Sequence, residues 1–434
     1  MTIAIATEPA VAADRAGESV DLRPHPPVAL YLHVPFCVSI CPYCDFVVYA
    51  GAAARGERSR VAAFLAALGV ELRLRADALD ERFGAPGGAN RPVLDSLYLG
   101  GGTPSLLPAD AIAELIDHVR ERFMLAKDAE VTLEANPGPD ERGDARELSR
   151  AGVTRLSIGA QSLDRAELRR LGRRHRPEDV GDTVAAAREA GIGSVSLDLL
   201  YDVPGGSLRT WVATLDAALD LRPDHLSLYA LTLDDPDAEG LTGPLGDHLP
   251  MGAGARRWRA SARAAQDDDL AAAQYRHATD RLAAAGWRGY EISNWARPGH
   301  ESRHNLAYWE RRPYAAIGPG AHAFDGAVRR WNAARLDAWL GALAPPDGGR
   351  PRLPPGGVEQ LDAATAAVEE VVLGLRTDRG VPAAAAARPP LEAAAGWALA
   401  NGLVTVARPE DGDDRIVLTT RGRLLSNELF ARLV

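Results

Sequence analysis

The three cysteines of this 434-residue chain lie within eight residues of one another, in the segment HVPFCVSICPYC. Cys37, Cys41 and Cys44 have the spacing C-x3-C-x2-C, and thiolates this close in sequence can converge on one inorganic centre. A closed cluster site needs four ligands, so three cysteines predict a [4Fe–4S] cluster with one iron open to another molecule. A structural zinc with His33 as fourth ligand is the alternative. The odd cysteine count in a long chain disfavours a disulfide framework.

Glycine-rich and polar groups follow later apolar runs. The glycines of Gly100-Gly101-Gly102-Thr103-Pro104 lack β-carbons, so the backbone there can approach a small ligand closely. The loop matches neither common nucleotide-phosphate motif, which disfavours phosphate binding. Glu134 and Asp198 could hold hydroxyl or amino groups, and Arg173 could pair with a carboxylate. Taken singly, each residue is better explained as a helix cap or a surface ion pair.

Short apolar runs alternate with helical stretches and position these groups. The runs predict strands over residues 28–34, 94–99, 130–134, 154–159, 195–200 and 225–231. The stretches predict helices over 60–79, 109–123, 140–151, 163–171, 177–190 and 207–221. Six βα units are typical of a parallel sheet but fall short of the eight in a closed barrel. The sequence predicts an α/β fold, either an open barrel or a doubly wound sheet.

The order of the strands predicts where the polar groups meet. The cysteines follow the first strand, the glycine loop the second, Glu134 the third and Gln161 the fourth, while Asp198 closes the fifth. In parallel βα folds the carboxyl ends of the strands form the functional face. We therefore expect these groups to converge on one site.

The rest of the chain divides by composition. Residues 1–27 lack periodicity and predict a disordered tail. Residues 28–260 hold the βα units and end in an Asp/Gly/Pro-rich surface loop at about 234–254. Residues 261–344 open with a helix over 261–285 and continue into a segment rich in aromatics and histidine. A linker over 345–357 precedes a domain over 358–434, with helices at 358–375, 391–401 and 421–433 and a strand at 416–419. This last order predicts a winged-helix-like α+β domain.

Composition excludes some classes of function. The net charge of −10 argues against a nucleic-acid surface, since such binding neutralises phosphates. The amino-terminal segment lacks the basic region of a secretory signal. The longest uncharged run, over 24–44, holds five prolines, which a membrane-spanning helix would not tolerate together. We expect a cytoplasmic protein.

Together these motifs resemble the radical S-adenosylmethionine superfamily. YLHVPF before the cysteines, GGGTP, EANP, GAQS and D-x-x-Y-x-x-P match the branch of oxygen-independent coproporphyrinogen III oxidases and HemW-type heme chaperones. The resemblance implies a partial (β/α)6 barrel and a [4Fe–4S] cluster on the three cysteines, with S-adenosylmethionine chelating the open iron. The implied S-adenosylmethionine contacts are Tyr31, Tyr43, Gly101, Gly102, Thr103, Glu134, Gln161, Arg173 and Asp198. One departure is Asp202, where members commonly have glycine.

Two features separate the branches. The oxygen-independent coproporphyrinogen III oxidases of this branch have a fourth cysteine at the position of Phe46 in this chain. The segment HNLAYW matches a motif that marks the heme chaperones and is thought to hold heme, which implies heme contacts at His304, Asn305, Tyr308 and Trp309. Both features favour a chaperone over a decarboxylating enzyme.

The resemblance therefore implies a protein that binds heme and hands it to a respiratory-chain apo-protein, expected to be a membrane enzyme. No nucleic-acid partner is expected, and a homodimer is left open. The enzymatic alternative is an oxygen-independent coproporphyrinogen III oxidase. A third hypothesis is an iron–sulfur or zinc structural protein.

Overall fold

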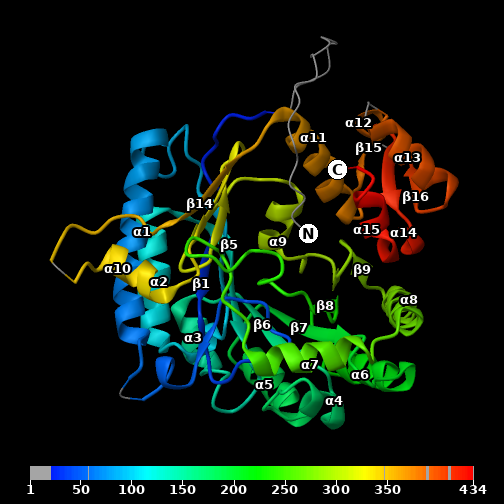
Figure 1. The fold of residues 1–434 in the computed structure, drawn as a ribbon, viewed down its shortest axis with the longest axis horizontal. Coiled ribbons are helices and arrows are strands. Elements are labelled where there is room, and N and C mark those ends of the chain that lie inside the picture. Colours follow the sequence, from blue (N-terminus) through cyan, green and yellow to red (C-terminus); the bar gives the residue numbers. More distant parts are fainter. Residues whose placement is uncertain (1–20, 57, 347, 388–390, 409–411, 434) are drawn as a thin grey trace.

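The structure, a computed structural model, describes residues 21–56, 58–346, 348–387, 391–408 and 412–433 (Figure 1). Most of the predicted tail, residues 1–20, lies outside these ranges. None of the described helices combines the length and the apolar character that crossing a membrane requires.

Six parallel strands form the centre of a twelve-stranded sheet. In spatial order they are β1 (Ala29–Val34), β4 (Leu94–Gly101), β5 (Leu125–Ala135), β6 (Arg155–Gln161), β7 (Ser194–Tyr201) and β8 (His225–Ala230). The helices between them are α1 (Val61–Phe83), α2 (Ala109–Arg122), α3 (Ala145–Ala151), α4 (Arg165–Arg170), α5 (Pro177–Glu189) and α6 (Leu208–Asp220). The fold is thus the expected partial (β/α)6 barrel, and the alternative of a doubly wound sheet is wrong.

Side-chain alternation along the strands separates the core from the barrel interior. Leu97 and Leu99 of β4 are fully buried in the main apolar core, which also includes buried residues of α1 and α2. Ser96 and Tyr98, which alternate with them, point the other way, because successive strand residues face opposite sides of a sheet. The interior is therefore lined by polar and aromatic side chains.

The sheet extends beyond the predicted strands on both sides. Beside β1 lie β11 (Tyr314–Ile317), β12 (His322–Phe324), β13 (Val328–Asn332) and β14 (Gly356–Gln360), and beside β8 lie β10 (Asn294–Ala296) and β9 (Arg288–Gly289). These strands have two to five residues, too few for a period-two pattern to stand out. The helix predicted over 358–375 is wrong at its start, because 356–360 pairs with β13 and α11 spans Ala363–Arg376.

Two other predicted helices are each divided in the structure. The helix predicted over 261–285 is α7 (Ala253–Arg263) and α8 (Asp268–Ala284), since Asp267 caps a new amino terminus by accepting from Asp269 N and Leu270 N. The terminal helix predicted over 421–433 is α14 (Thr420–Leu424) and α15 (Ser426–Phe430).

The carboxy-terminal module has a core of its own. Its antiparallel sheet has the order β15 (Val381–Pro382), β17 (Arg415–Leu418), β16 (Val404–Ala407), packed with α11, α12 (Ala383–Ala386) and α13 (Leu391–Ala400). The remaining elements are α9 (Arg303–Trp309), α10 (Leu336–Leu343), the short pair β2 (Phe36–Cys37) and β3 (Tyr49–Ala50), and two 3-10 helices, η1 (Gly51–Ala53) and η2 (Pro104–Leu106). This module and the partial barrel form the expected two-part architecture.

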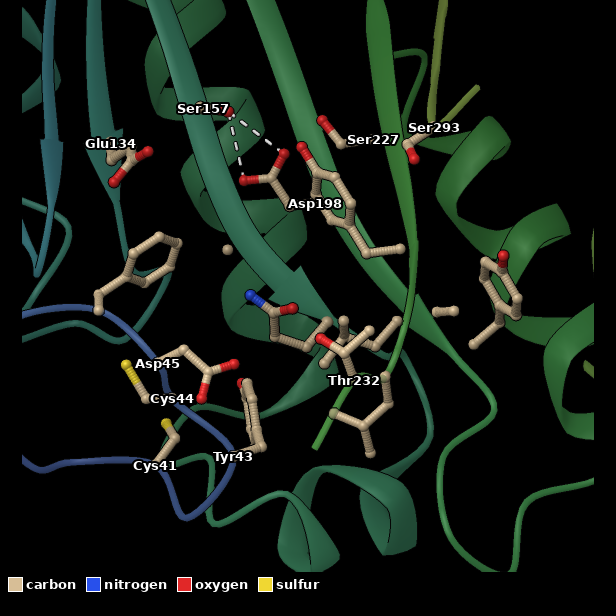
Figure 2. A pocket seen from close by; sticks show the side chains of 18 of the residues that line it. Cys41, Tyr43, Cys44, Asp45, Glu134, Ser157, Asp198, Ser227, Thr232 and Ser293 are labelled. Atoms are coloured by element: carbon tan, nitrogen blue, oxygen red, sulfur yellow. Dashed lines mark hydrogen bonds between the residues drawn. The ribbon is translucent and has the colours of Figure 1, made fainter. Parts of the chain in front are cut away.

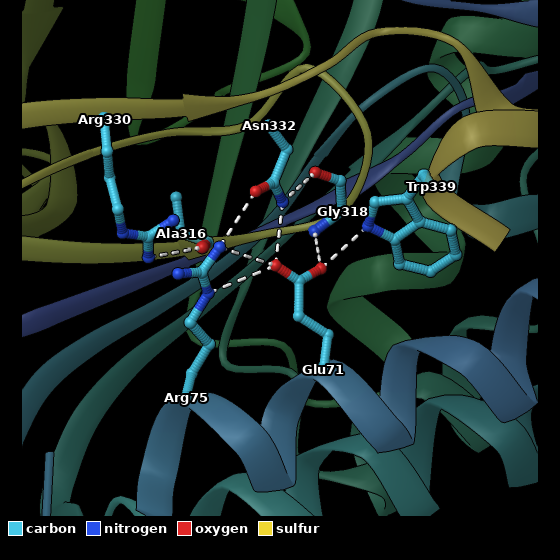
Figure 3. Close-up of polar contacts among 7 residues, drawn as sticks. All are labelled: Glu71, Arg75, Ala316, Gly318, Arg330, Asn332 and Trp339. Carbon is cyan, nitrogen blue, oxygen red and sulfur yellow. Dashed lines mark hydrogen bonds and ion pairs between the residues drawn. The ribbon is translucent and has the colours of Figure 1, made fainter. Parts of the chain in front are cut away.

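A buried carboxylate joins α1 to the extended part of the sheet (Figure 3). The Glu71 side chain is fully buried, and its Oε1 accepts from Asn332 Nδ2 at 2.8 Å and from Arg75. Its Oε2 accepts from Gly318 N at 3.0 Å and from Trp339 Nε1 at 2.8 Å. Both oxygens therefore face donors only.

Replacing Glu71 by glutamine should destabilise the fold by about 2–3 kcal/mol, because either orientation of the amide points its NH2 group at donors. Chemical denaturation of the two proteins measures the difference. Asp77→Asn on the same helix is the control, since this side chain is 59% exposed and should change stability by less than about 0.5 kcal/mol. Equal midpoints for Glu71→Gln and the parent would show that the network adds nothing.

Candidate functional site

A cavity of about 690 Å³ opens at the carboxyl ends of the parallel strands (Figure 2). All three cysteines line it, and across from them lie Glu134 and Asp198. Of the other sequence-predicted residues, Tyr43, Gly101, Gly102, Gln161, Arg173 and Asn305 also line this cavity. The structure thus brings together most of the residues that strand order predicted to meet.

The cysteines are free thiols in a partly buried setting. Burial raises the pKa of Cys37 to about 11 and that of Cys44 to about 12. Thr103 Oγ1 donates to Cys37 Sγ at 3.4 Å, and Arg173 Nη1 donates to Cys41 Sγ at 3.6 Å. Thiols with raised pKa values lose their protons when a metal centre binds them as thiolates, so loading this site releases protons.

Arg259 on α7 holds the cysteine loop in place. The residue is 5% exposed, and its guanidinium donates to Pro42 O at 3.1 Å, to Cys44 O at 3.0 Å and to Asp45 Oδ1 at 2.5 Å. The residue lies more than two hundred positions from the cysteines, so sequence reasoning did not find it. It anchors the loop through backbone oxygens on either side of Tyr43.

The glycines of GGGTP allow the end of β4 to pack closely against His33 and against β2, the short strand that contains Cys37. A β-carbon at Gly102 would lie 2.6 Å from Phe36 O, and one at Gly101 would meet the His33 ring at 2.3 Å. Gly101 also has a φ of +108°, which disfavours other residues. The motif is therefore required first by packing against the segment that carries Cys37.

Two partly buried carboxylates face the cavity. Glu134 accepts from Tyr98 Oη and from Gly101 N, both at 2.8 Å, and burial raises its pKa to about 7. Asp198 accepts from Ser157 Oγ at 3.3 Å, and burial raises its pKa as well. Buried carboxylates are costly unless a donor or cation neutralises them. They suit a ligand that brings hydroxyl or amino groups.

Arg173 supplies a positive charge beside the thiol of Cys41. Its Nη2 donates to Gly159 O at 2.7 Å and to Asn136 Oδ1, while its buried Nε has no partner among the described residues. Beside it, Gln161 has a φ of +65° at an irregularity of β6, the kind of strain that is found at ligand sites. The three thiols, the carboxylates of Glu134 and Asp198 and the guanidinium of Arg173 fit a cluster with three protein ligands and an amino-acid-like ligand.

The segment HNLAYW forms α9, which fills the barrel interior. Glu130 of β5 accepts from Arg303 N at 3.0 Å and from His304 N at 3.3 Å, at the amino terminus of this helix. His304 is 1% exposed, and its Nδ1 lies 2.9 Å from Ser96 Oγ. Its Nε2 lies 2.8 Å from Tyr308 Oη. Both ring nitrogens are thus engaged, and burial lowers the pKa of His304 to about 3.

Besides His304, four other predicted contacts lie off the main cavity. Thr103 is 1% exposed and lies behind Cys37. Tyr31 and Tyr308 line a second, smaller cavity instead. Trp309 packs under Arg376, whose guanidinium carbon lies 4.5 Å from the ring centre. Arg376 itself lines the main cavity, so Trp309 reaches it indirectly.

Sequence reasoning missed part of the lining. Tyr98, Arg155 and Ser157 precede the motif residues on the same strands, and period-two alternation places them in the interior. From the carboxy-terminal module, Arg423, Ser426 and Asn427 also line the cavity. No local signal in the sequence marks these three, because they come from a separate part of the chain.

Asp202 follows β7 with a φ of +58°, which explains why a glycine is common there. Aspartate is one of the few other residues that tolerate this conformation. Asp202 N donates to Gln274 Oε1 at 2.9 Å, and its Oδ1 accepts from Asp267 N at 3.4 Å. The added carboxylate thus contacts the start of α8, although the residue ends a strand beside the site.

The zinc alternative required His33 to face the thiols. Its Nδ1 instead lies 3.0 Å from Tyr31 Oη and its Nε2 lies 2.8 Å from Val47 O. Among the described residues, no group of three or more His, Cys, Asp or Glu side chains is arranged so that it could hold a single metal ion. The engaged histidine argues against a zinc site of that composition.

Comparisons with known proteins place these observations in a family. The profile of the Radical SAM superfamily matches residues 31–218. The chain is 40% identical to the heme chaperone HemW of Mycobacterium tuberculosis, over 95% of this chain and 96% of that protein. It is 37% identical to the HemW of Escherichia coli, over 68% and 70% of the two chains. A solved structure of the E. coli coproporphyrinogen III oxidase HemN aligns with a TM-score of 0.70 at 22% identity, covering 95% of this chain and 91% of that chain. That likeness concerns the fold alone.

Proposed function

Because the chain belongs to the HemW family of heme chaperones within the radical SAM superfamily, we propose that it binds heme and hands it to an apo-protein of the respiratory chain. The observation that carries this proposal is Phe46. The side chain at the position of the oxidases' fourth cysteine is apolar, 64% exposed and part of the cavity wall. An exposed phenyl ring suits contact with an apolar macrocycle.

Within this proposal the main cavity holds the resident cofactors. Cys37, Cys41 and Cys44 would ligate three irons of a [4Fe–4S] cluster, whose fourth iron takes the amino and carboxylate groups of S-adenosylmethionine. Arg173 would pair with that carboxylate, while Glu134 and Asp198 would accept from amino or hydroxyl groups. Gln161 would supply a further amide contact, and Tyr43 would pack beside the ligand. These cofactors would serve assembly or transfer rather than porphyrin decarboxylation.

The proposal assigns distinct parts to the HNLAYW residues. Asn305 lines the main cavity and Tyr308 lines the second one, so α9 lies between the two. Ligation of heme iron by His304 would require its Nε2 to leave Tyr308 Oη. In the arrangement described, the imidazole instead positions Tyr308, and Trp309 positions Arg376.

Anaerobic reconstitution with iron, sulfide and S-adenosylmethionine allows the proposal to be tested by two assays. Heme titration should give saturable binding with a shifted Soret band, and incubation with coproporphyrinogen III should give no decarboxylated product. Turnover of the porphyrinogen without heme binding would establish the oxidase alternative. We propose further that the protein works in the cytoplasm, with a membrane respiratory enzyme as acceptor.

The affinity for S-adenosylmethionine should rise about tenfold between pH 6 and pH 8. The pKa of Glu134 is about 7, and a ligand that donates to its carboxylate binds the ionised form, so protonation at low pH competes with binding. Calorimetric titration on the clustered protein measures this slope. In Glu134→Gln the contribution of this residue should vanish, leaving any titration of the ligand itself. An equal slope in both proteins would remove Glu134 from the contact.

A further inference from the structure

A second cavity, of about 280 Å³, lies beside β1, between the cysteine loop and the extended part of the sheet. Its walls are aromatic: Tyr31 of β1, Phe46, Tyr308 of α9 and Tyr314 of β11. The rings of Tyr308 and Tyr314 meet edge to face at 4.5 Å. Because Phe46 is 64% exposed and the His322 side chain 47% exposed, this cavity is an open groove.

Besides Asp45 and His33, the groove is lined by a hydrogen-bonded cluster of one carboxylate and two imidazoles. Asp247 Oδ1 lies 3.0 Å from His248 Nδ1, and Asp247 Oδ2 lies 2.8 Å from His322 Nε2. Although burial acts to raise it, these two hydrogen bonds hold the pKa of Asp247 well below its usual range. The carboxylate is therefore ionised and fixes both rings.

The Nε2 atom of His248 has no hydrogen-bond partner within the described ranges, while its Nδ1 is held by Asp247. Metal-bound histidines commonly donate their other ring N–H to a carboxylate, which orients the ring and makes the ligating nitrogen more basic. His304 differs in this respect, because both of its nitrogens are engaged inside the barrel.

We propose that this groove is the heme site, with His248 as the axial ligand of the iron, Asp247 orienting it, and the aromatic walls contacting the macrocycle. The inference rests on the proposed function and specifies where its cargo binds. An open groove with one strong ligand suits a protein that must release heme again. Asp45 and Phe46 line both cavities, so the cargo would lie beside the cysteine loop.

Titration of the reconstituted full chain with ferric heme tests the assignment. His248→Ala should weaken binding more than tenfold and shift the Soret maximum, and Asp247→Asn should weaken binding about tenfold through the orientation of the ring. His118→Ala on the exposed face of α2 is the matched control and should match the parent. Added imidazole should restore the parent Soret maximum in His248→Gly.

Metal-free protoporphyrin IX separates ligation from packing. It offers no iron, so His248→Ala should bind it as the parent does, while Phe46→Ala should weaken binding of both porphyrins. A parent that binds heme together with a His248→Ala variant of the same affinity and Soret maximum would overturn the groove assignment and leave the proposed function standing. A parent that binds no heme would overturn the proposed function itself. Equal loss of heme and protoporphyrin in His248→Ala would show a packing role and also reject ligation.

Discussion

Cys37→Ser, Cys41→Ser and Cys44→Ser should each abolish the iron–sulfur centre. A [4Fe–4S] cluster with three protein ligands has none to spare, and a serine oxygen is a harder, poorer ligand for its iron than thiolate. After anaerobic reconstitution we expect about four irons and about four sulfides per chain in the parent, and less than about one of each in the variants. Iron and acid-labile sulfide analysis measures this directly.

Folding must be separated from cluster loss in these variants. The three thiols lie in one eight-residue segment and outside the apolar cores, so circular dichroism and unfolding of the apo-proteins should match the apo-parent. A folded variant that keeps the full iron content would show that its cysteine is no ligand. One zinc per chain without sulfide in the parent would instead support the structural-zinc hypothesis.

Arg173→Ala should weaken binding of S-adenosylmethionine about a hundredfold, equivalent to about 2.7 kcal/mol. The guanidinium is part of the cavity wall, and it is the arginine that donates to a cysteine thiol within the described residues, since Arg259 contacts only the backbone oxygen of Cys44. Removing it would leave the ligand carboxylate without its buried partner. Equilibrium dialysis on the clustered protein gives the change in affinity.

Arg173→Lys is the control for charge alone. Lysine keeps the positive charge but loses the planar fork, whose Nη1 donates to Cys41 Sγ while Nη2 donates to Gly159 O and Asn136 Oδ1. We therefore expect intermediate binding. Iron content should stay at the parent level in both variants. Unchanged affinity in Arg173→Ala would remove this residue from the ligand contact.

The sequence predicted the barrel and the cysteine cavity because both depend on local pattern. Cys37, Glu134 and Asp198 sit at or just beyond the ends of long apolar strands, and strand order alone brings such positions to one face. Gly102 was expected to allow close approach of a ligand. In the structure its missing β-carbon makes room for the carbonyl oxygen of Phe36.

The remaining features depend on contacts between distant segments. Arg259 contacts Cys44 from more than two hundred residues away in the sequence. The ion pair of Asp247 with His322 joins a loop to the first residue of β12. The burial of His304 follows from the position of α9 inside the barrel, which a seven-residue helix pattern does not reveal. Short strands such as β12 were missed because three residues show no clear period.

Transfer of heme is the most direct test of the chaperone account. The reconstituted protein, loaded with one heme, would be mixed with membranes from heme-depleted cells, and respiratory oxidase activity would be followed over time. Serum albumin carrying the same heme concentration is the comparison. We expect faster and fuller recovery of oxidase activity with this protein than with albumin. Recovery no faster than from heme-loaded albumin would contradict the account.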